Sequence, residues 1–176
     1  FISWQEAATV RVQPAAGAVE AVRAAAGDAW PGLQGREGVG MITGRCLCGE
    51  ARYRSPGPTL FAIVCHCRDC QRASGSGGVP VLGVSRGPFA SEGPIKQVRT
   101  RGGSGHPAVR HICAQCGSLL FGTPESAPDL VTIYAGSLDD PTLFVPGEAI
   151  FVGQRPPWAR LAADLVEHVA LPAQTG

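Results

Sequence analysis

Short runs of apolar or alternating residues, separated by glycine, proline and aspartate, follow one another from Gly44 to about residue 152. Alternation over four to eight positions is the pattern of a half-buried strand, and breaks of this composition are typical of turns. The expected strands are Ala51–Arg54, Leu60–Val64, Val79–Val84, Ile95–Thr100, Ala108–Ile112, Ser118–Phe121, Leu130–Tyr134 and Ala149–Val152. The run Gly102–Gly105 is interpreted as a hairpin turn. The pattern predicts a mainly β domain of short antiparallel strands.

Helical spacing of apolar residues occurs only near the C-terminal end. Trp158, Leu161, Leu165 and Val169 recur at this spacing after a pair of prolines, which suits the first turn of a helix. We expect a short C-terminal helix whose apolar stripe covers the core. Trp158 is expected in the core rather than over a pocket, because large aromatic side chains are mostly buried.

The first 40 residues differ from the rest of the chain. They contain no cysteine, are rich in alanine and valine, and precede Met41, the only methionine. We interpret residues 1–40 as an N-terminal extension, either disordered or translated in frame from upstream of the natural start. A short appended helix around Ala15–Ala26 is the alternative interpretation. The functional domain is expected at residues 41–176.

Composition narrows the class of partner. A chain of 176 residues, 44% hydrophobic and 16% charged, is long enough for one globular domain with its own core. The net charge is only +1 and no block of basic residues is present, so nucleic acid and membrane surfaces are not expected as partners. A small-molecule partner is favoured.

The chain is expected in the cytoplasm of a bacterium. It shows neither a secretory signal pattern nor an apolar run long enough to span a bilayer. A single lysine beside many arginines, alanines and glycines suggests a GC-rich bacterial gene. In a reducing compartment the seven cysteines are expected as metal ligands rather than as disulfide partners, and an odd number cannot pair completely.

The cysteines form three groups, and their local sequence suggests how the groups combine. Cys46 and Cys48 form a CxC motif, and Cys113 and Cys116 form a CxxC motif. A glycine follows Cys48 and another follows Cys116, and glycine tolerates the left-handed turn around a metal-bound sulfur. We therefore expect these four cysteines to hold a structural zinc, which takes four ligands.

The middle group is CxCxxC and contains Cys65, Cys67 and Cys70. Three thiolates leave one coordination position of zinc open, as catalytic zinc sites do, and give the site one net negative charge. This is the pattern of a site that binds a thiol. The residues expected near that thiol are Arg68 and Arg72, which would offset the charge, and the small residues Ser74, Gly75 and Ser76 at the start of the run to Gly78, which let a ligand approach the backbone.

Other interpretations of these residues stay open. A CxxC motif alone occurs in redox pairs, and an iron–sulfur cluster could occupy the three-cysteine group. His66 lies between two expected ligands, and because adjacent residues of an extended segment point in opposite directions, we expect it to support or pack rather than to bind metal.

Several motifs resemble the family of glutathione-dependent formaldehyde-activating enzymes, which includes the centromere protein V domain. They are GRCLCG at residues 44–49 with Tyr53 following, CHCRDCQRASG at residues 65–75, CAQCGSL at residues 113–119, GSLDDP at residues 136–141 and the Pro157–Trp158 pair. The resemblance covers the chain from about Met41 onward and leaves out the first 40 residues.

The resemblance implies a β-tent fold stapled by two zinc ions and the activity of a carbon–sulfur lyase. Such an enzyme condenses a thiol such as glutathione with formaldehyde or a similar small aldehyde. By this analogy Cys65, Cys67 and Cys70 hold the catalytic zinc. The alternative is a non-catalytic, zinc-stapled binding module in which a fourth ligand completes the second site. Binding to nucleic acid or the cytoskeleton is a third hypothesis, against which the near-neutral charge counts.

Overall fold

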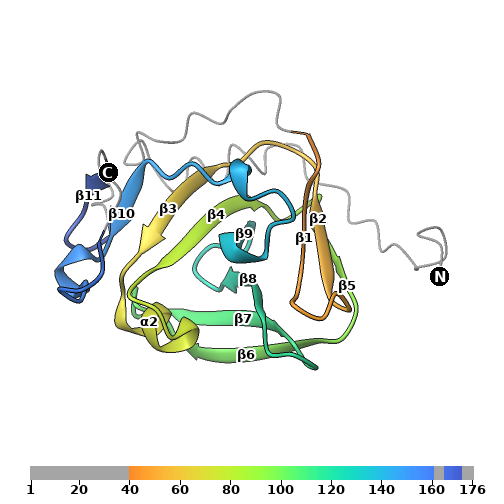
Figure 1. Cartoon of the computed structure of the whole chain (residues 1–176), viewed down its shortest axis with the longest axis horizontal. Coiled ribbons are helices and arrows are strands. Elements are labelled where there is room, and N and C mark those ends of the chain that lie inside the picture. Colours follow the sequence, from red (N-terminus) through yellow and green to blue (C-terminus); the bar gives the residue numbers. More distant parts are fainter. Residues whose placement is uncertain (1–39, 161–164, 172–176) are drawn as a thin grey trace.

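The computed structural model describes residues 40–160 and 165–171, which form two β-sheets and one short α-helix. The larger sheet has eight strands in the order β11-β10-β3-β4-β9-β8-β7-β6, and the smaller sheet has three in the order β1-β2-β5 (Figure 1). The strands are β1 (Ile42–Arg45), β2 (Arg52–Ser55), β3 (Phe61–Cys65), β4 (Val79–Ser85), β5 (Ala90–Glu92), β6 (Ile95–Arg101), β7 (Pro107–Cys113), β8 (Leu119–Pro124), β9 (Leu130–Tyr134), β10 (Glu148–Ile150) and β11 (Val166–Glu167). The helices are α2 (Arg68–Ser74) and the 3-10 turns η1 (Ala135–Ser137), η2 (Pro141–Leu143) and η3 (Val152–Gln154).

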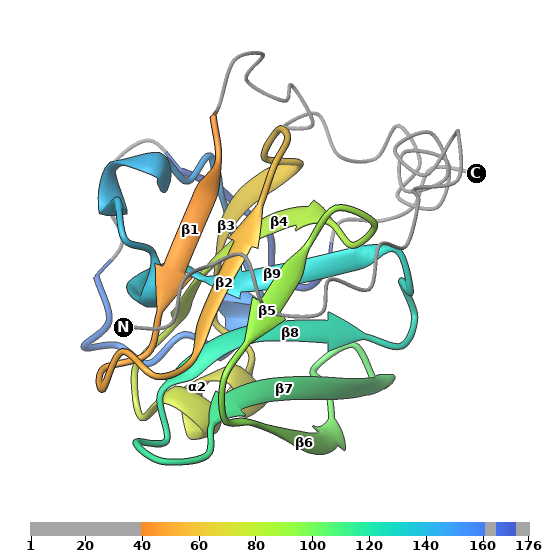
Figure 2. The ribbon, with the colours of Figure 1, turned by 90° about the vertical axis from the view of Figure 1, so that its right-hand side faces the viewer.

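The small sheet crosses one face of the large sheet, and the main core lies between them (Figure 2). Ile42 and Tyr53 from the small sheet meet Leu82, Phe121 and Ile133 from the large one, and all five are at most 3% exposed. Burial of large apolar side chains at this interface is the main favourable contribution to folding.

The opposite face of the large sheet carries a second, smaller core. Alternation along β3 directs Ile63 and Cys65 to this face, where they pack with Val79 and Val81 of β4 and Ile150 of β10. Helix α2 follows directly after β3 and lies beside β7 in both views (Figures 1 and 2). The sheet therefore curls, so that α2 and the far hairpin β6–β7 meet.

Each of the eight expected strands overlaps an observed strand, and Gly102–Gly105 is the predicted turn between β6 and β7. Strands β1, β5 and β11 were not expected. The expectation of purely antiparallel pairing is wrong, because β10 is parallel to both β3 and β11. The chain reaches β10 through the long connection that contains η1 and η2, which returns it to the edge of β3 in the same direction.

The expected C-terminal helix is wrong in the part of this segment that the structure describes. Residues 166–167 form β11, and the backbone N–H groups of Val166 and His168 donate to Gly147 and Ala149 at 3.0 and 2.8 Å. These bonds satisfy the open edge of β10, and an α-helix could not supply them. Trp158 and Val169 are 69% and 75% exposed, so the stripe does not cover the core. Leu161 lies outside the described residues.

Two further expectations concern the N-terminal extension and membrane-spanning helices. The predicted extension at residues 1–40 lies outside the described residues, apart from Gly40. Within the described ranges, no helix is long and apolar enough to cross a membrane.

Candidate metal centres

Cys46, Cys48, Cys113 and Cys116 converge in one cluster, although 65 residues separate Cys48 from Cys113. The sulfur of Cys48 lies 3.4 Å from that of Cys46 and 3.7 Å from that of Cys113, and all four sulfurs lie within 4.8 Å of one another. Cys46 and Cys113 are buried in the main core, Cys116 is half-buried and Cys48 is exposed. The cluster joins the turn between β1 and β2 to the turn between β7 and β8.

Both turns have the backbone that the glycines of the motifs predict. Gly49 and Gly117 adopt φ angles of 82° and 74°, which glycine tolerates without strain. The Gly49 N–H donates to the Cys46 carbonyl at 3.0 Å, and the Gly117 N–H donates to the Cys113 carbonyl at 2.9 Å. Each turn thus wraps around its pair of sulfurs. The Ser118 hydroxyl lies 3.2 Å from the Cys116 sulfur, and hydrogen bonds from Ser118 lower the pKa of Cys116 to about 5.

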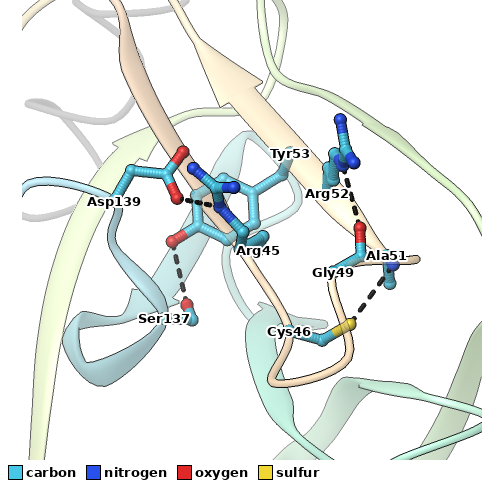
Figure 3. A network of polar contacts seen from close by, with 8 residues as sticks. All are labelled: Arg45, Cys46, Gly49, Ala51, Arg52, Tyr53, Ser137 and Asp139. Carbon is cyan, nitrogen blue, oxygen red and sulfur yellow. Dashed lines mark hydrogen bonds and ion pairs between the residues drawn. The ribbon is translucent and has the colours of Figure 1, made fainter. Parts of the chain in front are cut away.

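A polar network ties the first turn to a distant segment (Figure 3). The Arg45 guanidinium pairs with the Asp139 carboxylate at 2.5 Å, and the Tyr53 hydroxyl lies 2.8 Å from the Ser137 hydroxyl. Gly44 forms an isolated bridge with Leu138. Two of the sequence motifs noted above, around residues 44–53 and 136–141, therefore meet here and hold the strand that presents Cys46.

Cys65, Cys67 and Cys70 form the second cluster, with their sulfurs within 4.8 Å of one another. Cys65 ends β3, Cys67 caps α2 and Cys70 lies in its first turn. The backbone N–H of Cys70 donates to the Cys67 sulfur at 3.4 Å. Cys65 and Cys67 are buried in the second core and Cys70 is half-buried. The two clusters therefore belong to the cores on opposite faces of the large sheet.

The three thiols interact strongly. Hydrogen bonds from Cys65 and Cys70 hold the pKa of Cys67 well below that of an ordinary thiol, while the contacts with Cys67 and Cys70, together with burial, raise the pKa of Cys65. Among the three thiols, Cys67 is thus the one whose thiolate form is stabilised by its neighbours. A cation would displace the remaining protons, because thiols bind metals as thiolates.

The donor sets fit two metal ions. Zinc–sulfur bonds of about 2.3 Å in a tetrahedral arrangement bring sulfurs to about 3.8 Å from one another. The sulfur–sulfur distances from Cys48 to Cys46 and to Cys113, 3.4 and 3.7 Å, are close to this value and too long for disulfides. All seven cysteines are free. Among the residues that the structure describes, no histidine, aspartate or glutamate joins the three-cysteine cluster as a fourth ligand.

The residues expected to contact a thiol lie on α2 and in the turn that follows it, an element that the sequence analysis did not predict. The Arg68 guanidinium contacts the Gln71 side chain, and the Arg72 side chain is exposed in the last turn. Gly75 ends the helix with φ 68°. Ser74 and Ser76 bond to one another at 2.7 Å and to the carbonyls of residues 70 and 78. The role of these five residues in thiol binding stays a prediction.

Three residues near the second cluster were missed. Gly103, in the β6–β7 turn, approaches Cys67 so closely that a β-carbon there would lie 2.8 Å from its sulfur. Tyr134 packs against the second core, and the charge of the buried Arg110 acts on Cys70. The sequence did contain a signal for Arg110. Alternation in the expected strand Ala108–Ile112 places this charged residue on the same face as the apolar residues at the two ends of the strand.

His66 and Trp158 border a hollow of about 340 Å³ behind the second cluster. The His66 ring is 2% exposed and its Nδ1 lies 2.7 Å from the Gly77 carbonyl, so it packs and supports the turn after α2, as expected. The expectation that Trp158 belongs to the core is wrong. Trp158 reaches this hollow because Gly77 has no side chain, and a β-carbon there would lie 2.6 Å from the indole ring.

Comparison with known proteins agrees with these motifs. The profile of the family described as glutathione-dependent formaldehyde-activating enzyme matches residues 41–154. A Halomonas elongata protein that carries a provisional name as an enzyme of this kind is 28% identical over 129 residues, which cover 69% of this chain and 81% of that protein. A crystal structure of a Rhodobacter sphaeroides protein, 16% identical, aligns with a TM-score of 0.45 over 55% of this chain and 87% of that one. The family match spans more than half of the chain and includes all seven cysteines, and the protein therefore belongs to the glutathione-dependent formaldehyde-activating enzyme family.

Proposed function

We propose that this protein is a zinc-dependent carbon–sulfur lyase that joins a thiol such as glutathione to a small aldehyde such as formaldehyde. The four-cysteine cluster would hold a structural zinc and the three-cysteine cluster a catalytic one. The observation that carries the proposal is the difference between the clusters. One has four sulfur donors, and the other has three with no fourth ligand from the described residues.

Zinc held by three thiolates supplies a position where a thiol ionises near neutral pH and where a carbonyl oxygen is polarised. In the reaction the substrate sulfur adds to the aldehyde carbon. The carbon–sulfur bond forms, the carbonyl π bond breaks, and the proton lost from the sulfur ends on the oxygen. Cys65, Cys67 and Cys70 would fix the reacting centre, since β3 and α2 hold them rigidly.

The surroundings of the cluster suit such a reaction. Phe151 belongs to the same core as Cys65 and Cys67 and adopts φ 57°, a conformation that costs a non-glycine residue on the order of 1 kcal/mol or more. Gly103 closes over Cys67 from the β6–β7 turn. Cys65 and Cys67 are buried in these surroundings, and a low local dielectric would strengthen electrostatic interactions with a bound substrate.

The finer assignments follow from the same argument. We propose a β-tent architecture for the two sheets, small-molecule thiol and aldehyde partners, and no nucleic-acid or membrane partner. We also propose the cytoplasm as its compartment, because reducing conditions keep cysteines available as metal ligands.

The test is a native mass spectrum of the full chain with and without glutathione, paired with an NMR assay of glutathione–formaldehyde condensation above the spontaneous rate. The proposal expects two zinc ions, one bound glutathione and catalysed turnover. Cys67→Ser should lose the glutathione and the turnover but keep one zinc. Two zinc ions with neither bound thiol nor turnover would instead support the zinc-stapled binding module, and a coloured protein with bound iron would support an iron–sulfur cluster.

A further inference from the structure

Arg110 is a buried cation on the face of the large sheet that carries the three-cysteine cluster. It is 6% exposed, and its Nη1 donates to the Thr100 hydroxyl. It pairs in register with Gly122 of β8, which pairs in turn with Thr132 of β9. Because Gly122 has no side chain, the guanidinium can cross β8 to the phenol of Tyr134, with which it interacts. A β-carbon at Gly122 would lie 3.7 Å from that phenol oxygen.

Tyr134 connects this cation to the sulfurs. Its ring packs against the core that contains Cys65, Cys67 and Cys70. Burial raises the pKa of Tyr134 to about 12, the charge of Arg110 opposes this shift, and the charges of Cys70 and Cys65 add to it. The phenol therefore lies between the guanidinium, which it approaches across Gly122, and the core that contains the sulfurs.

Arg110 has no carboxylate partner among the described residues. The ion pairs found there join Arg45, Arg99, Arg155 and His168 to acidic side chains, and the Nε of Arg110 has no hydrogen-bond partner. A buried guanidinium without a carboxylate partner is costly, and an anionic metal–thiolate centre on the same face of the sheet would offset that cost. Tyr134 lies next to Gly122, the register partner of Arg110, and packs with Cys70 against the core that contains Cys65 and Cys67, so the guanidinium and the sulfurs lie on either side of the phenol.

The position of Arg110 affects the net charge of the three-cysteine centre. A divalent metal with three thiolates carries one net negative charge, which Arg110 cancels. Binding of a fourth thiolate would bring the metal and its ligands to two net negative charges. When the positive charge of Arg110 is included, the net charge is one negative. Arg68 and Arg72 lie on α2, where solvent screens exposed charges, so they can contribute little to this balance.

We propose that Arg110 determines the ligand specificity of the three-cysteine centre, favouring an anionic sulfur over a neutral ligand in the fourth position, and that Tyr134 positions its guanidinium. The inference rests on the proposed function, because it assumes that the centre holds a divalent metal and binds a substrate thiol. It assigns to Arg110 of β7 the role that the sequence suggested for the arginines of the helix.

The experiment uses the full chain loaded with Co²⁺, whose absorption reports both bound thiolate and coordination. Glutathione is the anionic ligand and imidazole the neutral one. Arg110→Met should weaken glutathione binding about 10- to 100-fold, the loss typical of a buried charged contact, and change imidazole binding less than about threefold. Arg110→Lys should recover most of the affinity, and Tyr134→Phe should lose less than Arg110→Met. Arg99→Met, which removes an exposed cation of β6 paired with Glu125, should bind like the parent chain.

Two outcomes separate the inference from the proposed function. If the parent chain binds glutathione and turns over, but Arg110→Met binds glutathione as tightly, the inference about Arg110 is wrong and the lyase assignment stands. If the parent chain binds glutathione in an Arg110-dependent manner without turnover, the inference stands and the lyase assignment fails. A parent chain that binds no thiol overturns both.

The Co²⁺ spectrum of the four-cysteine cluster reports folding of each variant. If Arg110→Met does not fold, Arg110→Gln replaces it, because glutamine keeps a donor for Thr100.

Discussion

Gly103 approaches the three-cysteine cluster closely, and substitution at this position is a sharp test of the site. A β-carbon at this position would lie 2.6 Å from the Cys67 β-carbon and 2.8 Å from its sulfur. Contacts of this kind are normally about 3.5–4.0 Å, so Gly103→Ala introduces an overlap of about 1 Å. The φ angle of Gly103 is not in the left-handed region, and the backbone itself therefore accepts alanine.

The cost of this overlap falls on the metal centre. Overpacking of a well-packed site typically costs about 1–3 kcal/mol. Cys67 cannot rotate away without leaving the cluster, so the structure relaxes by moving either the sulfur or the β6–β7 turn. If the sulfur moves, this cost corresponds to a loss of about 5- to 150-fold in metal affinity at this centre. The four-cysteine cluster, in the core on the opposite face, should be unaffected.

The assay is a chelator titration of the full chain, followed by alkylation of the released cysteines and peptide mapping, which assigns each lost metal to its cluster. Gly105→Ala is the matched control in the same turn. Gly105 has φ 86°, and its substituted methyl group would meet no atom within 4 Å, so alanine there strains the turn without touching Cys67. Equal metal loss in both variants, or equal loss from both clusters, would refute the steric argument.

Three further predictions concern the four-cysteine cluster and its supports. Cys113→Ser should leave the chain unfolded at 25 °C by far-UV circular dichroism, because structural zinc contributes on the order of 10 kcal/mol, comparable to the whole stability of a domain, whereas Cys67→Ser should stay folded. Gly44→Ala should lower the free energy of unfolding in urea by about 1–3 kcal/mol or more, since its methyl group would lie 2.1 Å from the Tyr53 hydroxyl. Ser118→Ala should raise the pKa of Cys116 from about 5, and zinc release on acidification, followed with a chromogenic chelator, should then begin at a higher pH.

Each of these predictions has a control and a contrary result. Gly40→Ala, with no atom near its methyl group, should unfold at the same urea concentration as the parent chain. The lowered pKa of Cys116 favours its thiolate, so a variant with a higher pKa lets protons compete with the metal at a higher pH. Ser118→Ala that releases zinc at the same or a lower pH would contradict the role of the hydroxyl. A folded Cys113→Ser chain would mean that the main core needs no metal staple.

Local sequence was sufficient for most of the strands. Val79–Ser85 and Leu130–Tyr134 follow the expected ranges closely, because apolar β-branched residues bounded by glycine and proline have few other conformations available. The short strands β1, β5 and β11 lack such a pattern of their own. They form because a neighbouring edge offers unpaired backbone groups, which is a property of the assembled sheet rather than of the segment.

The missed helix α2 and the wrongly expected C-terminal helix also show where local sequence was insufficient. Helix α2 was missed because its cysteines and its glycine-rich continuation have the composition of a loop, and the helix depends on Cys67 as its cap and on Gly75 as its left-handed end. The C-terminal stripe has the correct helical spacing, yet Val166 and Glu167, which lie between two of its residues, pair with β10 as a strand. Tertiary hydrogen bonding outweighed a weak local preference in the C-terminal segment, whereas α2 depends on local caps that the composition did not reveal.

By itself the sequence determined the grouping of the seven cysteines into sets of four and three, because the spacing within each motif and the glycines of the turns restrict which sulfurs can converge. Only the tertiary structure decided what surrounds the three-cysteine set. Arg110 and Gly103 are distant from it in the sequence, and the curl of the sheet brings them to it. Ligand spacing is a local property of the chain, whereas the charge and the space around a metal centre depend on contacts that exist only after the sheets have packed.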